Sequence, residues 1–298
     1  MHTLLRIVFL IFVVGFFMAA HVYLWRRLVR DSQLNAIWRK ALTVLFVAGA
    51  IILPTTMVLA RFIHRAKIST AAMPAYIWLG VIVYLLICVL SVDLFGRLRS
   101  KLRKDSTRES IIDPERRVFF SRLAAGVSTI GTLGAVGYGV HSAIGPVTTP
   151  RIYIALPRFP KALDGFRIVQ LTDMHIGAVL GRPFIDYIIE TTNAQKPDLV
   201  VITGDMVDAP VRLIGKDIAA LKGLKSRYGT YFVTGNHEYY SGAESWLTFL
   251  DKVGIHTLLN RFERIGDNEA SFDLVGIPDD RGAWVNELHT PRLLSTTR

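Results

Sequence analysis

The sequence predicts two fold classes in one chain, an all-α membrane region followed by an α/β domain. The first half contains four apolar stretches of membrane-spanning length, and after Pro146 short β-type runs alternate with helix-length segments. Charge divides in the same way, because residues 1–150 carry 18 Lys and Arg against 6 Asp and Glu, whereas residues 151–298 carry 17 against 18. The predicted boundaries are a membrane region at 1–146, a linker at 147–164 and an α/β domain at 165–298.

Composition excludes several classes of protein. A hydrophobic content of 51% and a mean hydropathy of +0.36 are too apolar for an ordinary soluble protein of 298 residues. The net charge of +11 belongs to the first half and lies between apolar stretches, so we interpret it as a topology signal and expect no nucleic-acid binding. The single cysteine, Cys88, excludes an intrachain disulfide and a thiolate metal site.

About four transmembrane helices are expected in the first half. A cleaved signal peptide does not fit the first stretch, which is long, ends in bulky residues and is followed by further spans. A helix buried in a soluble core is the alternative for any one stretch, but three nearly uncharged stretches within 92 residues favour a membrane. The predicted spans cover about residues 4–25, 41–60, 68–92 and 123–144.

The basic residues in the loops predict an orientation. Five Lys and Arg lie between the first two spans, three between the second and third, and nine between the third and fourth. Placing the first and third loops in the cytoplasm puts fourteen basic residues there against four on the other side. We therefore expect a multi-pass protein of the cell (inner) membrane, with the domain after Gly145 outside the cytoplasm.

A pair of arginines precedes the fourth span. Arg116 and Arg117, followed by Val118-Phe119-Phe120 and a weakly apolar Gly/Ala-rich stretch, resemble a twin-arginine export signal. The alternative is a basic flank that stops a membrane helix. Both interpretations place the following domain outside the cytoplasm.

The second half predicts strands and helices in alternation, which is typical of an α/β domain. A linker rich in proline contains one short candidate strand at 152–154, and the Asp164-Gly165 turn precedes the domain. The other predicted strands are 167–171, 199–202, 230–233, 255–259 and 272–277, and the predicted helices are near 183–194, 215–224 and 243–253.

Three polar blocks follow three consecutive predicted strands: Asp173-Met174-His175, Gly204-Asp205-Met206-Val207-Asp208 and Gly235-Asn236-His237-Glu238. In open α/β sheets, ligands bind at the carboxyl ends of the strands. Carboxylate, imidazole and amide oxygen together are the donors that hard-to-borderline divalent metals require. The blocks therefore indicate two-metal phosphoester hydrolysis.

Each residue type suits a part of that chemistry. If the chain stays extended, Asp173 and His175 share a face and reach one metal. The carboxylate of Asp205 can bridge two cations, and Asn236 offers a second metal a neutral oxygen. His237 could stabilise the transferring phosphoryl group or protonate the leaving oxygen, since imidazole titrates near neutral pH. Asp208 could orient a ligand or touch metal, and Glu238 is interpreted as local structure.

The blocks D-x-H, G-D-x-x-D and G-N-H-E resemble the calcineurin-like metallophosphoesterase family over about residues 165–277, and their place after membrane spans resembles its bacterial transmembrane subgroup. The resemblance implies a four-layer α/β/β/α sandwich and two divalent ions drawn from Mn, Fe, Zn or Mg. It implies that Asp173, His175 and Asp205 hold the first metal, with Asp205 bridging, that Asn236 holds the second, and that His237 is the catalytic imidazole.

The sequence departs from the family after the third block. Of its eight histidines only His256 and His289 follow, and neither lies in the G-H-x-H motif that supplies further metal ligands in the family. His289 is interpreted as a surface residue, and the tail at 293–298 does not resemble a finished strand or helix. The expectation is a fragment with an incomplete second metal site, weak metal occupancy and little hydrolysis.

The leading prediction is a membrane-anchored metallophosphoesterase acting on a soluble or lipid-linked phosphodiester or pyrophosphate. The alternative is an inactive remnant that serves as a membrane interaction module. A small transporter with a soluble appendage is less favoured, because the second and third spans carry no ionisable group that would mark a polar path.

Overall fold

The computed structural model describes residues 2–59, 62–63, 65–102 and 114–279. The chain divides into two compact units, and the division between the helical unit and the α/β unit falls between Thr149 and Pro150.

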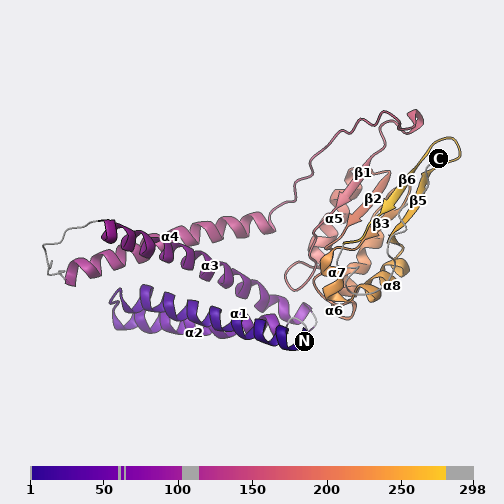
Figure 1. The fold of residues 1–298 in the computed structure, drawn as a ribbon. Helices are drawn as coiled ribbons and strands as arrows, with labels where there is room; N and C mark the ends of the chain where they lie inside the picture. Colours follow the sequence, from indigo (N-terminus) through magenta and orange to yellow (C-terminus); the bar gives the residue numbers. More distant parts are fainter. Residues whose placement is uncertain (1, 60–61, 64, 103–113, 280–298) are drawn as a thin grey trace. The chain divides into compact units, whose positions relative to one another are not determined.

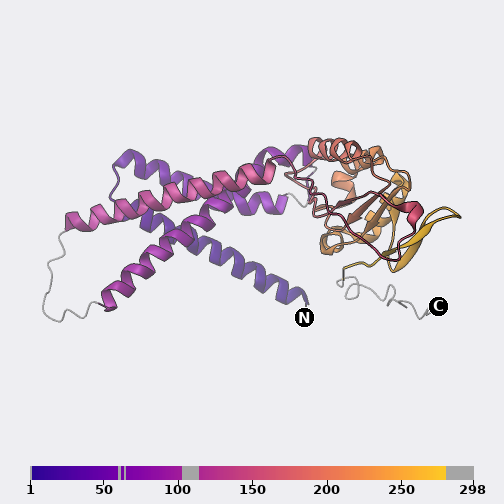
Figure 2. The same ribbon diagram turned by 90° about the horizontal axis from the view of Figure 1, so that it is seen from above.

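The helical unit consists of four long helices (Figures 1 and 2). They are α1 (His2–Trp25, continued by the π-helical turn η1, Arg26–Arg30), α2 (Ala36–Leu59), α3 (Arg65–Leu102) and α4 (Pro114–Ile144). By length and composition, four segments within them could cross a membrane: Ile11–Arg30, Ala36–Leu59, Lys67–Leu98 and Val118–Ile144. Large apolar side chains are exposed on all four, as expected of surfaces that face lipid rather than water.

An aromatic cluster joins the first three helices. His21 of α1 is buried, and its Nε2 lies 3.1 Å from the Trp78 Nε1 of α3. Because an indole nitrogen only donates, His21 Nε2 must be the acceptor, so the ring proton is on Nδ1 and is donated to the Phe17 carbonyl at 2.9 Å. Phe46 of α2 packs edge-on against Trp78. With both ring nitrogens satisfied, His21 links helices as a neutral group, as polar side chains in membrane bundles commonly do.

Polar contacts join the α1–α2 connection to α3 and to the first part of α4. Tyr23 Oη donates to Asp93 of α3 at 2.8 Å, and Arg27 of η1 pairs with the same carboxylate. Arg122, near the start of α4, donates to the carbonyls of Ser32 and Gln33 at 2.9 and 3.1 Å. The α1–α2 connection and the start of α4 therefore lie on one side, as alternating spans require.

The α/β unit contains six strands and four α-helices in the described residues. The strands are β1 (Ile168–Leu171), β2 (Leu199–Thr203), β3 (Thr230–Val233), β4 (His256–Thr257), β5 (Arg261–Gly266) and β6 (Ser271–Gly276). The helices are α5 (Arg182–Ala194), α6 (Val211–Ile218), α7 (Asn236–Ser241) and α8 (Ala243–Val253), with 3-10 turns at Lys161–Leu163 and Ala219–Gly223. Strands β1–β4 form a parallel sheet in sequence order, and β5 and β6 form an antiparallel hairpin. The register pairs Leu171 with Ile202 and Thr203 with Val233, so the strands end together.

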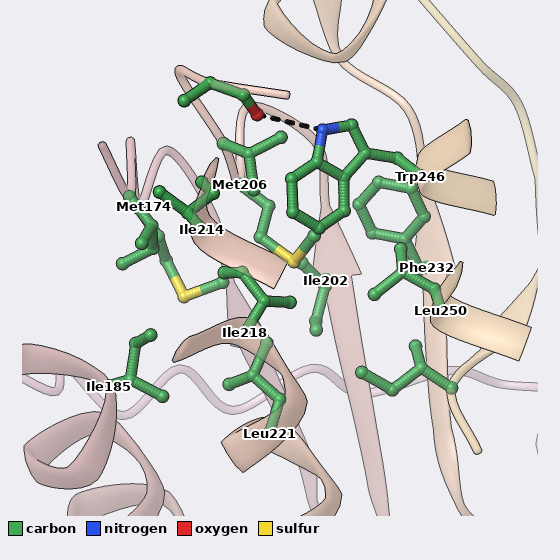
Figure 3. Close-up of a cluster of buried hydrophobic side chains, with 14 of the residues drawn as sticks. Met174, Ile185, Ile202, Met206, Ile214, Ile218, Leu221, Phe232, Trp246 and Leu250 are labelled. Carbon is green, nitrogen blue, oxygen red and sulfur yellow. Dashed lines mark hydrogen bonds between the residues drawn. The ribbon is translucent and has the colours of Figure 1, made fainter. Parts of the chain in front are cut away.

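The parallel sheet is covered differently on its two faces. Ile202 and Phe232 point into a cluster with helices α5, α6 and α8, where Trp246 is fully buried and its Nε1 donates to the Ala209 carbonyl at 3.1 Å (Figure 3). Leu199 and Tyr231 point the other way and pack with the β5–β6 hairpin. Alternation along β2 and β3 thus yields a helix layer, a sheet and a hairpin layer, with α5 and the hairpin on opposite sides of β1–β3 in Figure 1.

Several expectations need correction. Residues 152–154 are not a strand, although Ile152, Tyr153 and Ile154 have a β-type composition, because no neighbouring strand pairs with them in the described residues. The hairpin strand β5 and the short helix α7 escaped prediction, since β5 is strongly polar and α7 has only six residues. The α/β fold class is confirmed, and the described part of the chain shows one helix layer and two sheets, as expected of an incomplete α/β/β/α sandwich.

Candidate metal centre

The three polar blocks converge because they follow adjacent parallel strands. Asp173 and His175 follow β1, Asp205 follows β2, and His237 follows β3. The first two loops also bond to each other, since the His175 N–H donates to the Asp205 carbonyl at 3.0 Å, and residues 176 and 207 form an isolated parallel bridge. The sheet register and these bonds fix the relative height of the loops.

The ligand-bearing loops are not extended. Asp173, His175 and Asp205 have φ angles of 53°, 45° and 50°, in the left-handed region that side-chain-bearing residues rarely occupy. The expectation that Asp173 and His175 share a face of an extended chain is therefore wrong. They are brought together by two left-handed turns, a conformation that costs energy and is commonly retained at functional sites.

Four side chains surround one small volume. His175 Nε2 lies 3.9 Å from Asp205 Oδ2 and 4.0 Å from Asp173 Oδ1. Ligand atoms of His175, Asp205 and His237 all lie within 4.8 Å of one another, so this group could hold a metal ion. Asp205 is the most shielded carboxylate, with 17% of its side chain exposed, whereas Asp173 is 64% exposed.

Asn236 lies directly against Asp205. With its NH₂ group turned to the carboxylate, the amide donates to Oδ1 and Oδ2 at 3.1 and 3.0 Å. Turned by half a rotation, its carbonyl oxygen instead joins the cluster of oxygen donors, an arrangement that a shared cation would stabilise. The His237 N–H, one residue on, also donates to Asp205 Oδ1 at 2.9 Å.

Asp208 connects the two imidazoles. Its Oδ1 lies 3.0 Å from His175 Nδ1 and 2.6 Å from His237 Nδ1, and the two rings are edge-to-face with centroids 4.5 Å apart. A carboxylate only accepts, so each ring carries its proton on Nδ1 and leaves Nε2 available. The sequence suggested that Asp208 could orient a ligand, but it did not predict contact with both imidazoles.

The electrostatics of the centre are acidic. Within the described residues, the ion pairs of Asp173, Asp205 and Asp208 involve only His175 and His237, with no lysine or arginine. Burial lowers the pKa of His175, but its hydrogen bond to Asp208 and the charges of Asp208, Asp205 and Asp173 outweigh this effect and raise the pKa above its usual value. The cluster therefore attracts positive charge.

Two glycines permit the close approach of the second and third loops. Gly204 has φ of 83°, and a Cβ there would lie 2.6 Å from the Gly235 nitrogen. A Cβ at Gly235 would lie 2.5 Å from the Asp205 nitrogen and closer still to its Oδ1. Each glycine thus stands where any side chain would separate the loops.

Glu238 is more than a local cap. It is fully buried and accepts hydrogen bonds from four backbone N–H groups, of Gly235, Asp205, Met206 and Val207. Only the first of these belongs to the capping box of α7. The spacing of G-N-H-E predicts the cap, but not the partners some thirty residues earlier.

The remaining predicted residues lie elsewhere. His256 is in β4, where its ring lies 5.1 Å from that of Tyr231. His289 and the tail at 293–298 lie outside the described residues.

Fold and site together define a class of protein. Residues 166–290 match the model of the calcineurin-like phosphoesterase family, so this part of the chain is a calcineurin-like metallophosphoesterase domain. The family uses divalent metal ions, and the group of His175, Asp205 and His237 is a candidate for binding them.

Known relatives combine such a domain with membrane spans. The chain is 29% identical over 290 residues, 93% of its length, to a "Transmembrane protein with metallophosphoesterase domain" of Danio rerio. It is 31% identical over 282 residues, 88% of its length, to the protein of the same description in Bos taurus. The chain spans 64% and 60% of the lengths of these two relatives.

A bacterial relative matches the second half. An "Uncharacterized metallophosphoesterase" of Helicobacter pylori is 35% identical over 150 residues, which is 50% of this chain and 39% of that protein. Relatives thus include vertebrate as well as bacterial proteins, and the likeness does not single out the bacterial subgroup. Together with the four apolar helices, they support a membrane protein with a metallophosphoesterase domain.

Proposed function

We propose that the chain is a metal-dependent phosphoester hydrolase with a two-metal centre, anchored in the membrane with its α/β domain outside the cytoplasm. The observation that carries the proposal is the convergence of Asp173, His175, Asp205, Asn236 and His237 from three adjacent loops. These groups have no lysine or arginine partner in the described residues, and their donors are those that a divalent ion prefers.

The donor set fits a first metal ion. Two atoms that each lie about 2.1 Å from one ion are separated by at most about 4.2 Å. The separations of His175 Nε2 from Asp173 Oδ1 and Asp205 Oδ2 are 4.0 and 3.9 Å, which meet that limit. Asp173, His175 and Asp205 would hold this ion, and Asp205 and Asn236 would hold a second. Bound there, the ions would neutralise phosphate charge and activate water.

His237 is the proposed catalytic imidazole. Asp208 accepts a hydrogen bond from Nδ1 of His237 and so keeps the ring proton on that nitrogen. The other ring nitrogen, Nε2, therefore faces away from the Asp208 carboxylate. A protonated Nε2 can donate to a phosphoryl oxygen or to the leaving oxygen, and Asp208 stabilises the positive charge that this protonation brings. The His237 side chain is 36% exposed, so a solute can reach it.

The substrate class is a phosphoester, and membrane anchoring makes a lipid-linked phosphodiester a candidate beside soluble ones. The fourteen-to-four distribution of basic residues in the loops supports the extracytoplasmic orientation. Arg116 and Arg117 lie in the first turn of α4, where either a twin-arginine signal or a basic helix flank agrees with that orientation.

Hydrolysis of a chromogenic phosphodiester tests the proposal. The purified full chain in detergent should hydrolyse bis(p-nitrophenyl) phosphate slowly when supplied with Mn²⁺, because only Asp205 and Asn236 are available to a second ion. The rate should fall to background with chelator. Asp205→Ala should abolish the rate, whereas the exposed Asp186→Ala on α5 should not change it. Absence of any metal-dependent rate in the wild-type chain would contradict the proposal.

A further inference from the structure

We infer that Glu238 is a positioning residue that holds the metal-binding loops together through the backbone. The inference rests on the proposed function, because its effect is exerted on the proposed ligands. Both carboxylate oxygens are used twice: Oε1 accepts from the Met206 and Val207 N–H groups at 2.8 and 3.2 Å, and Oε2 accepts from Asp205 and Gly235 at 3.0 and 2.8 Å.

Three of the four bonds go to the loop after β2. Gly204 and Asp205 of this loop both have positive φ angles, in the left-handed region. The chain turns there so that the N–H groups of the following residues point in one direction. Met206 and Val207 are fully buried, so water cannot replace the carboxylate as their acceptor. In the described part of the chain, these N–H groups have Glu238 as their acceptor.

The connection between the loops is reciprocal. Glu238 of α7 binds the loop after β2, and Asp205 of that loop accepts the His237 N–H of α7 at 2.9 Å. Loss of the Glu238 carboxylate would therefore release Asp205 from both its backbone position and its contact with α7. The proposed ligands Asp205 and Asn236 would then no longer be held side by side.

The chemistry of the carboxylate predicts that an amide cannot replace it. In Glu238→Gln, one acceptor oxygen becomes an NH₂ group that faces two backbone donors. In Glu238→Asp the charge remains, but the side chain is one methylene too short to reach both loops. Both substitutions should therefore disturb the centre, although neither removes a proposed ligand.

Manganese affinity, measured by electron paramagnetic resonance on the purified full chain in detergent, tests the inference. We expect Glu238→Gln and Glu238→Asp to weaken Mn²⁺ binding about 10- to 100-fold, as loss of groups that orient ligands typically does. Glu244→Gln, on the exposed side of α8, makes the same chemical change and should bind Mn²⁺ as the wild type does. Ile188→Val and Leu250→Ala remove buried methyl groups from the core. They show how far reduced stability alone weakens Mn²⁺ binding.

The outcomes separate the two claims. The inference is wrong if both Glu238 variants bind Mn²⁺ as tightly as the wild type. It is also wrong if their affinity falls only as far as their melting temperature falls, as in the core variants. In both cases the metal centre stands. If one Glu238 variant does not fold, the other decides. If the wild type itself binds no Mn²⁺, the proposed function fails and the inference fails with it.

Discussion

The candidate ligands are placed by backbone conformations that individual residues would rarely adopt. Asp173, His175 and Asp205 all have positive φ. At Asp205 the strain is offset by hydrogen bonds that the backbone N–H groups of the loop after β2 donate to Glu238. Such rigid positioning suits a metal centre, because ligands that are already oriented lose little freedom on binding.

Protons should compete with metal at His175. The nearby carboxylates raise its pKa in the metal-free protein, and metal binds only the neutral ring. A raised pKa keeps the imidazolium populated to higher pH, so Mn²⁺ affinity should fall as pH falls from about 8 to about 5.5. Titrations at several pH values measure this. Asp208→Asn removes one of the groups that raise the pKa and should move the fall in affinity to lower pH; an unchanged pH dependence would argue against the assignment.

The side chains at the candidate metal centre were easier to predict from the sequence than the contacts between them. The strand-end position of Asp173, Asp205 and His237 followed from the alternation of apolar runs and polar blocks. The contact of Asp208 with both imidazoles did not, because it depends on how the loop after β2 folds back. Glu238 is a similar case, since three of its four partners are distant in sequence.

The loops after β2 and β3 approach each other so closely that only glycine fits at Gly204 and Gly235. Gly235→Ala should push these loops apart, because the added Cβ would overlap Asp205. The cost of such overpacking is about 1–3 kcal/mol of unfolding free energy, and Mn²⁺ binding should be lost with it. Thermal unfolding and metal titration measure the two effects.

Gly223→Ala is the matched control, since a Cβ there meets nothing closer than 3.4 Å. Equal behaviour of the two variants would show that the close approach of the two loops is not needed for stability or metal binding.

Long apolar or strongly patterned elements were predicted well, and short polar ones were not. The predicted helices near 183–194 and 243–253 correspond to α5 and α8, and the predicted strands at 199–202 and 230–233 correspond to β2 and β3. The hairpin strand β5 carries Arg261, Glu263 and Arg264, and its burial pattern is mostly exposed. It is held by pairing with β6 across a short turn, and a strand this polar has no alternating apolar pattern that would predict it.

For the molecule as a whole, the orientation prediction can be tested with single cysteines. In a Cys88→Ser background, Ser245→Cys on α8 should react with a membrane-impermeant maleimide added to intact cells. Ala36→Cys, at the start of α2 and also exposed, should react only after the cells are opened. The reverse pattern would place the α/β domain in the cytoplasm.

The most direct test of a metal centre is the stoichiometry and affinity of Mn²⁺ bound by the purified full chain. The described residues offer three ligands to a first ion, but only Asp205 and Asn236 to a second. We therefore predict one tightly bound Mn²⁺ per chain, a weaker second ion, and loss of both in Asp205→Asn. Failure of the wild-type chain to bind Mn²⁺, or binding that Asp205→Asn leaves unchanged, would contradict the assignment of these three loops as a metal centre.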